Sequence, residues 1–218
     1  MKKNLLGILF LFWVCMAWAG ELKLWYSKPA KDWTEALPVG NSRLGAMVYG
    51  GTGREELQLN EETFWAGGPY DNNNTNALYV LPVVRNLIFQ GKTREAQRLV
   101  DANFLARKDG MSYLTMGSLF LDFPGHEEAT DFYRDLNIED ATATTRYKVD
   151  GVTYTRRVFA SFTDSVIVVR LTTPGHKGKL NFSLRMQDGR QGMTRVDGHT
   201  MTIKGTLDLL SYEAQALL

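Results

Sequence analysis

Alternation of hydrophobic and polar residues with a period of two dominates the chain and predicts a mainly β protein. The clearest case is a pair of alternating runs, 141–149 and 152–160, separated by Asp150 and Gly151. Two residues of this kind favour a type I′ turn, which needs a positive φ at both positions, so we expect a β-hairpin here. Further alternating runs follow at 164–173, 179–187, 199–205 and 209–218. Many short strands separated by turn residues are typical of an antiparallel sandwich.

Within the run 164–173, residues Val166 to Val169 are apolar without alternation. A strand with two apolar faces is usually buried on both sides. We therefore expect this strand to lie inside the stack of sheets.

Residues from about 77 to 105 depart from the strand pattern and predict an inserted helical hairpin. Apolar residues recur there at helical spacing in two stretches, divided by Gly91. The first stretch follows Pro82, a residue that suits the first turn of a helix. The second helix is expected to begin at Thr93.

The first 19 residues read as an export signal. Lys2 and Lys3 precede an apolar run that ends in Ala17-Trp18-Ala19, which predicts a signal peptide cleaved before Gly20. Residues 20–218 would then be the mature chain, periplasmic or extracellular, and no later segment is long and apolar enough to predict a membrane span.

Composition limits the classes of partner and site. The 218 residues contain 25 basic and 24 acidic side chains, a net charge of +1, which gives no field to attract nucleic acid. Cys15 is the only cysteine, and it belongs to the predicted signal peptide. The three histidines are isolated from one another, so no metal site is predicted.

The glycine-rich segment 38–55 does not match a phosphate-binding loop. Gly40 and Gly45 have the Walker spacing, but Ala46 and Met47 stand where Lys and Ser or Thr are needed. We expect a tight turn at Gly40 and Asn41, a buried strand over 44–49, and a hairpin turn over 50–53.

Four carboxylates follow or border this segment, namely Glu55, Glu56, Glu61 and Glu62. Glu61 and Glu62 are adjacent, so on an extended backbone they point to opposite faces and cannot flank one bond as an acid and base pair. We interpret the four as a solvated strand face.

Aromatic residues beside amides stand out in the segment 57–74, LQLNEETFWAGGPYDNNN. Sugars present the complementary combination of C–H faces and hydroxyl groups. Trp25, Tyr26 and Trp33 repeat the mixture near the start of the mature chain. The alternative is that these aromatic rings belong to an ordinary sandwich core.

Three long motifs resemble one known family. Residues 24–51, 57–74 and 124–171 resemble, in order and spacing, the N-terminal β-sandwich of glycoside hydrolase family 95, the α-L-fucosidase family. The likeness extends from about Leu22 to the end of the chain.

The resemblance implies a domain organisation and an activity that the residues alone do not indicate. Members of the family have an N-terminal super-sandwich, a helical linker, an (α/α)₆ barrel and a C-terminal β domain. They hydrolyse terminal α-L-fucosyl linkages with inversion, without a cofactor, and some prefer α-L-galactosides. Their catalytic groups come from the barrel. No position here matches that part, so we assign no catalytic residue and predict that the 218 residues alone are inactive.

The same resemblance suggests a role for the segment 57–74. We expect Asn60, Glu61 and Trp65 to face the cleft between this domain and the barrel, at the rim of the pocket for a fucosylated glycan. The chain ends on Leu217 and Leu218 without a polar tail, which indicates either an edge strand or a domain that continues further; we favour the second.

Two alternatives to an N-terminal fucosidase domain stay open. A stand-alone carbohydrate-binding sandwich would bind fucosides without hydrolysing them. The N-terminal domain of a disaccharide phosphorylase, or of another relative, would need a phosphate site elsewhere, and an export signal argues against it.

Overall fold

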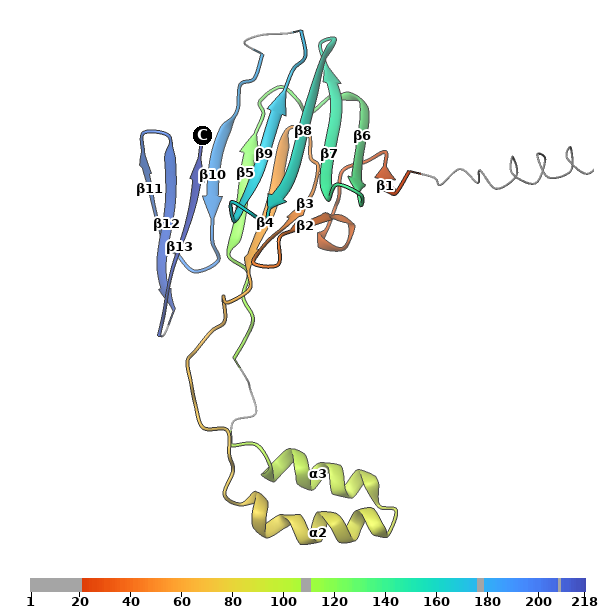
Figure 1. The fold of residues 1–218 in the computed structure, drawn as a ribbon, viewed down its shortest axis with the longest axis vertical. Helices are drawn as coiled ribbons and strands as arrows, with labels where there is room; N and C mark the ends of the chain where they lie inside the picture. Colours follow the sequence, from red (N-terminus) through yellow and green to blue (C-terminus); the bar gives the residue numbers. More distant parts are fainter. Residues whose placement is uncertain (1–20, 107–110, 176–178, 208) are drawn as a thin grey trace, which may run out of the picture.

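The computed structural model describes residues 21–106, 111–175, 179–207 and 209–218. Two antiparallel five-stranded sheets lie one against the other (Figure 1). The first contains, in spatial order, β1 (Lys23–Tyr26), β6 (Thr130–Asn137), β7 (Thr142–Val149), β8 (Val152–Ser161) and β9 (Val166–Thr172). The second contains β10 (Ser183–Gln187), β5 (Gly117–Asp122), β4 (Arg54–Glu61), β3 (Leu44–Val48) and β2 (Leu37–Gly40). The predicted mainly β, antiparallel sandwich is confirmed.

The hydrophobic core lies between these two sheets. Every strand from β2 to β8 contributes apolar side chains to it, because alternate residues of each strand face the opposing sheet. The buried members are Leu37, Val39, Ala46, Val48, Leu57, Leu121, Phe123, Leu136, Ala143 and Val158.

The predicted hairpin at Asp150 and Gly151 is confirmed. Strands β7 and β8 pair with Val149 opposite Val152, which leaves the two turn residues between them. Their φ values are 48° and 78°, both positive as a type I′ turn requires.

The glycine-rich segment also folds as predicted. The Asn41 amide lies in the turn between β2 and β3, where its oxygen accepts hydrogen bonds from the N–H groups of Arg43 at 3.2 Å and Leu44 at 2.7 Å. Its nitrogen donates to the Ser161 carbonyl at 2.7 Å, which ties this turn to the end of β8. Strand β3 follows, and Gly50 begins the turn to β4 with a φ of 75°.

Strand β9 differs from the prediction, because it lies at the edge of the first sheet, beside β8. Val166 is 43% exposed, and Ile167 to Val169 are half-buried. The apolar run therefore reflects partial cover by the second sheet, rather than burial on both faces.

A third, smaller sheet contains β11 (Met193–Asp197), β12 (Thr200–Leu207) and β13 (Leu210–Leu217). It packs beside β10, with β12 in contact with that strand. Tyr212 of β13 joins it to the segment after β4, because its ring meets the Phe64 ring edge-on at 5.1 Å between centroids. The Tyr212 hydroxyl also donates a hydrogen bond to Asp188.

The predicted helical hairpin is confirmed and consists of α2 (Ala77–Phe89) and α3 (Thr93–Asn103). It projects from the sheets on two connecting segments, 62–76 and 104–116 (Figure 1), which we call the stalk; residues 107–110 of it are not described. β-bridges between Trp65 and Tyr113 and between Asn73 and Leu105 hold the two segments together.

Pro82 is not in the first turn of α2, as the sequence suggested, but in its interior. The helix begins one turn earlier, at Ala77, because Ala77, Leu78 and Leu81 favour helix and continue the apolar spacing. A proline at this position removes one helical hydrogen bond.

The predicted signal peptide lies outside the described residues. Among the residues that are described, no helix is long and apolar enough to cross a membrane.

Candidate binding site at the end of strand β4

Strand β4 carries two of the predicted site residues, Asn60 and Glu61, at its end. Both side chains are half-buried and engaged locally. The Asn60 side-chain oxygen accepts a hydrogen bond from the Glu61 N–H at 2.8 Å. The Glu61 carboxylate accepts from the N–H and hydroxyl of Thr63, at 2.8 and 2.6 Å, and from Arg43 Nε at 3.1 Å.

These contacts set the charge of Glu61. Partial burial raises its pKa, but the Thr63 hydrogen bonds and the Arg43 guanidinium outweigh this effect, so the pKa lies below its usual value of 4.5. Glu61 is therefore an ionised carboxylate that fixes the turn after β4, and it lacks the raised pKa of a general acid.

Trp65 follows in the stalk and is 43% exposed. Its indole N–H donates to the Glu62 carbonyl at 2.9 Å, and its ring packs on Tyr113 at 4.7 Å between centroids. The ring is thus held in one orientation with part of its surface open to a ligand or another domain.

An open groove of about 490 Å³ lies beside Trp65 at the base of the stalk. It combines one carboxylate and one hydroxyl with aromatic and apolar surface. Its lining residues are Glu62, Thr63, Trp65, Gly67, Gly68, Pro69, Met111 and Leu210.

Of the three predicted site residues, Trp65 lines this groove, whereas Asn60 and Glu61 lie at the end of β4 and are not among its lining residues. Sequence analysis missed Met111 and Tyr113, which come from the returning segment of the stalk. Their alternation with Ser112 is a short strand signal, but such a local pattern does not identify Trp65 as the partner.

The other aromatic residues divide between core and surface. Phe64 is buried, with the Arg190 guanidinium 5.0 Å above its ring. Trp25 and Trp33 are 66% and 56% exposed. Neither the surface nor the core interpretation therefore holds for the whole set.

Glu55 contradicts the prediction of a solvated strand face, because it is fully buried between the sheets. Its carboxylate accepts hydrogen bonds from the N–H groups of Gly50 at 2.6 Å and Glu56 at 3.1 Å, and lies 3.5 Å from Arg156 Nε. The alternation with Leu57 puts Glu55 on the inward face, a signal that the sequence did contain.

A set of buried polar side chains surrounds this pair. Arg156 also donates to the Gly51 carbonyl and lies over the rings of Phe123 and Tyr147. Burial raises the pKa of Glu55, opposed by the Arg156 charge and the Gly50 N–H, and raises the pKa of Tyr147 to about 12. No groove is lined by these groups in the part of the chain that is described, so we assign them a structural role.

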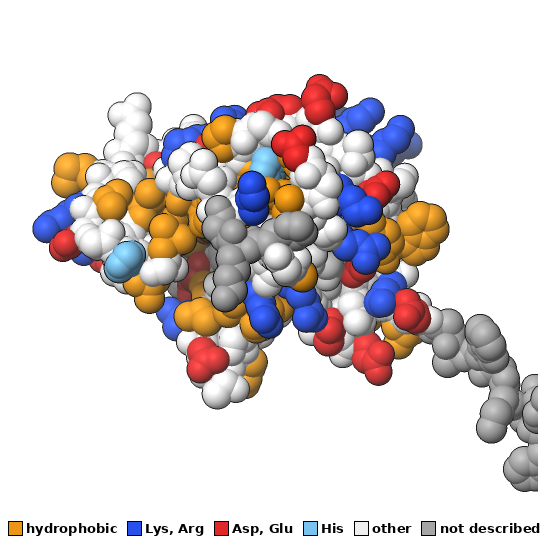
Figure 2. All heavy atoms as spheres, turned by 90° about the horizontal axis from the view of Figure 1, so that it is seen from above, with side chains coloured by type: hydrophobic (Ala, Val, Ile, Leu, Met, Phe, Trp, Pro, Cys, Tyr) orange, Lys and Arg blue, Asp and Glu red, His pale blue; other side chains and the backbone are white. Residues whose placement is uncertain are grey.

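The described residues offer little for a metal or a polyanion. Among them, no group of three or more His, Asp or Glu side chains is arranged to hold a metal ion. Basic and acidic side chains are interspersed on the face shown in Figure 2. The aromatic groove is thus the best candidate for a neutral ligand or a protein contact.

Comparison with known proteins identifies several relatives. The chain is 36% identical over 166 residues to "Alpha-L-fucosidase 2" of Arabidopsis thaliana. This alignment covers 75% of this chain and 19% of the relative. It is 27% identical to "Probable alpha-fucosidase A" of Aspergillus niger and 30% identical to the protein of the same name of Aspergillus oryzae. These alignments cover 80% and 72% of this chain, and 23% and 22% of the relatives.

The chain thus spans about a fifth of the length of the relatives it matches. A family model also matches residues 24–216, which is nearly the whole described sandwich with its stalk and hairpin. Together with the antiparallel sandwich fold, this match shows that the chain belongs to the family described as glycosyl hydrolase family 65, N-terminal domain.

Proposed function

We propose that this chain is the N-terminal, non-catalytic domain of an exported glycoside hydrolase of the family 95 type that acts on terminal α-L-fucosyl linkages. The observation that carries the proposal is the 36% identity to the Arabidopsis α-L-fucosidase over 75% of the chain. The family match describes an N-terminal domain of a glycosyl hydrolase, which agrees with a catalytic domain elsewhere in a longer protein.

The reaction would be a single displacement with inversion. A carboxylic acid protonates the leaving oxygen, while a second carboxylate activates a water on the opposite face of the sugar, the two being roughly 6.5 to 9.5 Å apart. Among the described residues, the groove beside Trp65 has a single lining carboxylate, Glu62. This supports the assignment of both catalytic groups to the barrel domain.

In this proposal the sandwich supplies a scaffold and part of the pocket rim. The fixed Trp65 ring offers a surface on which a sugar C–H face or an apolar part of the barrel can pack. Glu61 and Asn60 act as positioning residues, since they hold the turn from which Trp65 projects.

The proposal is tested by sequencing the DNA downstream of the Leu218 codon and expressing the longer reading frame. We expect the longer protein to release L-fucose from an aryl α-L-fucoside, and the 218-residue chain to release none. Release by the short chain, or a longer protein without this activity, contradicts the proposal. Mass spectrometry of the mature protein tests export, with Gly20 expected as the first residue.

A stand-alone carbohydrate-binding sandwich is the second candidate. The exposed Trp65 ring beside an open groove favours it, because sugar-binding sites commonly use such rings. Isothermal calorimetry of the 218-residue chain with L-fucose separates the two. Binding by the wild type that Trp65→Ala removes, together with a stop codon after Leu218, would support this candidate over the proposal.

A further inference from the structure

The helical hairpin presents two faces of different character. α3 (TREAQRLVDAN) is largely polar and exposes charged side chains. α2 (ALYVLPVVRNLIF) has a single charged residue, Arg85, and packs Val84 against α3. The hairpin is therefore polar along one helix and apolar along the other.

α2 is apolar over most of its circumference. With 3.6 residues per turn, six residues span an arc of about 140° centred opposite Val84, which faces α3. We call these residues the outer face of α2: Leu78, Tyr79, Pro82, Val83, Asn86 and Phe89. Asn86 is the single polar member of this face. Tyr79 is 78% and Phe89 86% exposed. An exposed helix face that is mostly apolar marks a surface for contact with another part of a protein.

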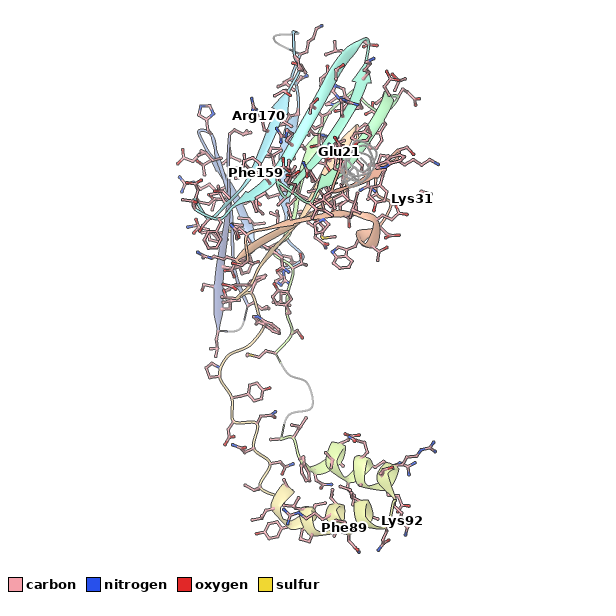
Figure 3. All side chains as sticks on the ribbon, turned by 45° about the vertical axis from the view of Figure 1, so that its right-hand side comes forward. Glu21, Lys31, Phe89, Lys92, Phe159 and Arg170 are labelled. Atoms are coloured by element: carbon pink, nitrogen blue, oxygen red, sulfur yellow. The ribbon has the colours of Figure 1, made fainter. Side chains whose placement is uncertain are left out.

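No part of the described sandwich covers this outer face. α2 packs on α3, and neither helix makes extensive contact with any of the described strands. Figure 1 shows the hairpin away from the sheets at the end of the stalk, and Figure 3 shows Phe89 beside the turn that carries Lys92, at the far end of α2. The face is available to a partner outside the described chain.

We propose that the outer face of α2 docks on an apolar surface of the same polypeptide, in the part of the longer protein that lies beyond this chain. This inference rests on the proposed function, which assigns the chain to a longer protein. Most of each relative lies outside the aligned segment, which spans 19 to 23% of their lengths. The partner surface would be uncharged, or acidic only opposite Arg85.

The size of the face argues for a partner on the same polypeptide. A helix of 13 residues is about 20 Å long and about 10 Å wide, so one face offers a few hundred Å² at most. Each partner in a stable complex buries roughly 800 Å². A second copy would thus form a weak contact, whereas a covalently linked domain needs less area because its effective concentration is high.

Hydrogen exchange of the α2 amides, measured in the 218-residue chain and in the longer protein, is the first test. We expect exchange of residues 77–89 to be slower in the longer protein by about tenfold or more, because docking suppresses local opening. Equal rates in the two proteins would overturn the inference.

The second test is a pair of variants with the same change of charge. Tyr79→Lys with Phe89→Lys places two cations on the outer face of α2, and we expect it to remove the added protection in the longer protein. Gln97→Lys with Ala102→Lys places two cations on exposed positions of α3, and we expect protection to stay. Retained protection in both variants, or loss in both, contradicts docking through α2.

Docking of α2 on a second copy of the chain is the alternative, and sedimentation with the same variants tests it. Sedimentation of the 218-residue chain is expected to show a monomer; a dimer that Tyr79→Lys with Phe89→Lys dissociates would overturn the inference.

Fucosidase activity of the longer protein separates this inference from the proposed function. A longer protein with protected α2 but no fucosidase activity removes only the proposed function. A stop codon after Leu218 removes both.

Discussion

The Glu55 and Arg156 side chains form a buried ion pair between the two five-stranded sheets. Their side chains are 1% and 2% exposed. Among the described residues, Glu55 Oε2 and the Arg156 Nε and Nη1 atoms have no hydrogen-bond partner, so the hydrogen bonds of Glu55 Oε1 and Arg156 Nη2 compensate these two charges only in part. A pair of this kind costs desolvation, and its net value depends on what replaces it.

Removal of one partner should be far more damaging than removal of both. We expect Glu55→Gln to lower the free energy of unfolding by about 3–5 kcal/mol, because it leaves the Arg156 charge buried without compensation. Glu55→Leu with Arg156→Met should recover most of this loss. Urea denaturation measures the free energy of unfolding of each variant. If the double variant loses as much of it as Glu55→Leu and Arg156→Met lose when added together, this explanation is ruled out.

His126 should make stability depend on pH. It is buried, its Nδ1 lies 2.9 Å from the Tyr147 hydroxyl, and its ring packs on Tyr154. Burial, with the nearby Arg156 charge, lowers the pKa of His126 below its usual value of 6.5.

The unfolded chain therefore binds the proton more readily than the folded protein between the two pKa values. Stability from this group is present above pH 6.5 and is lost as the pH falls through the lower, folded pKa. His126→Gln should flatten this part of the profile of unfolding free energy against pH, whereas His199→Gln should keep it. A wild-type profile that rises toward acid across this range would refute the assignment.

The third sheet depends on a close approach between Gly205 of β12 and Tyr212 of β13, which are directly opposite each other. A Cβ at position 205 would overlap the Tyr212 ring. This ring holds the contact with Phe64 and the hydrogen bond to Asp188. Because Gly205 has no side chain, the Tyr212 ring has room to reach Phe64 and so joins the third sheet to the stalk.

We expect Gly205→Ala to lower the free energy of unfolding by about 1–3 kcal/mol, as is usual for overpacking. Gly189→Ala is the matched control and should be close to neutral, because none of the described residues lies within 4 Å of its added Cβ. Denaturant unfolding compares the two. Equal stability of both variants would show that the Tyr212 ring shifts without cost.

Locally encoded elements were predictable from the sequence. The turn at Asp150 and Gly151, with its flanking strands, depends on φ preferences and alternation over a few residues. The start of α3 at Thr93 depends likewise on local spacing. The edge position of β9 was not predictable, since strand order depends on pairing between segments far apart in the chain.

The candidate site was predictable only in part. Trp65 was found because it belongs to a dense aromatic and amide segment, but its partners Tyr113 and Met111 come from the returning half of the stalk. Glu55 was misplaced although its alternation with Leu57 indicated an inward side chain. The expectation of a solvated carboxylate fails because Arg156, the partner that compensates the buried charge, is distant in the sequence.

Two of the exposed apolar surfaces lie on the stalk and the hairpin. One is the groove beside Trp65 at the base of the stalk, and the other is the outer face of α2 at its far end. Both therefore belong to the same projection from the second sheet. A domain that packs along the stalk would cover both, which links the proposed pocket rim to the proposed docking face.

The role of the groove can be tested in the longer protein with Trp65→Ala, and with Asn60→Ala and Glu61→Ala as changes to the turn after β4. We expect Trp65→Ala to raise KM about fivefold, or to lower the melting temperature by about 2–4 °C, which corresponds to about 1 kcal/mol. The turn variants should have smaller effects in the same direction, because they act through the position of Trp65.

Phe162→Ala is the control for these variants. Phe162 is an aromatic residue, 78% exposed, in the connection between β8 and β9, and it does not line the groove. Its replacement should leave both KM and melting temperature unchanged. If Trp65→Ala behaves like this control in steady-state kinetics and in thermal unfolding, then the groove neither borders the pocket nor contacts the catalytic domain. Its aromatic surface would then serve only to join the two halves of the stalk.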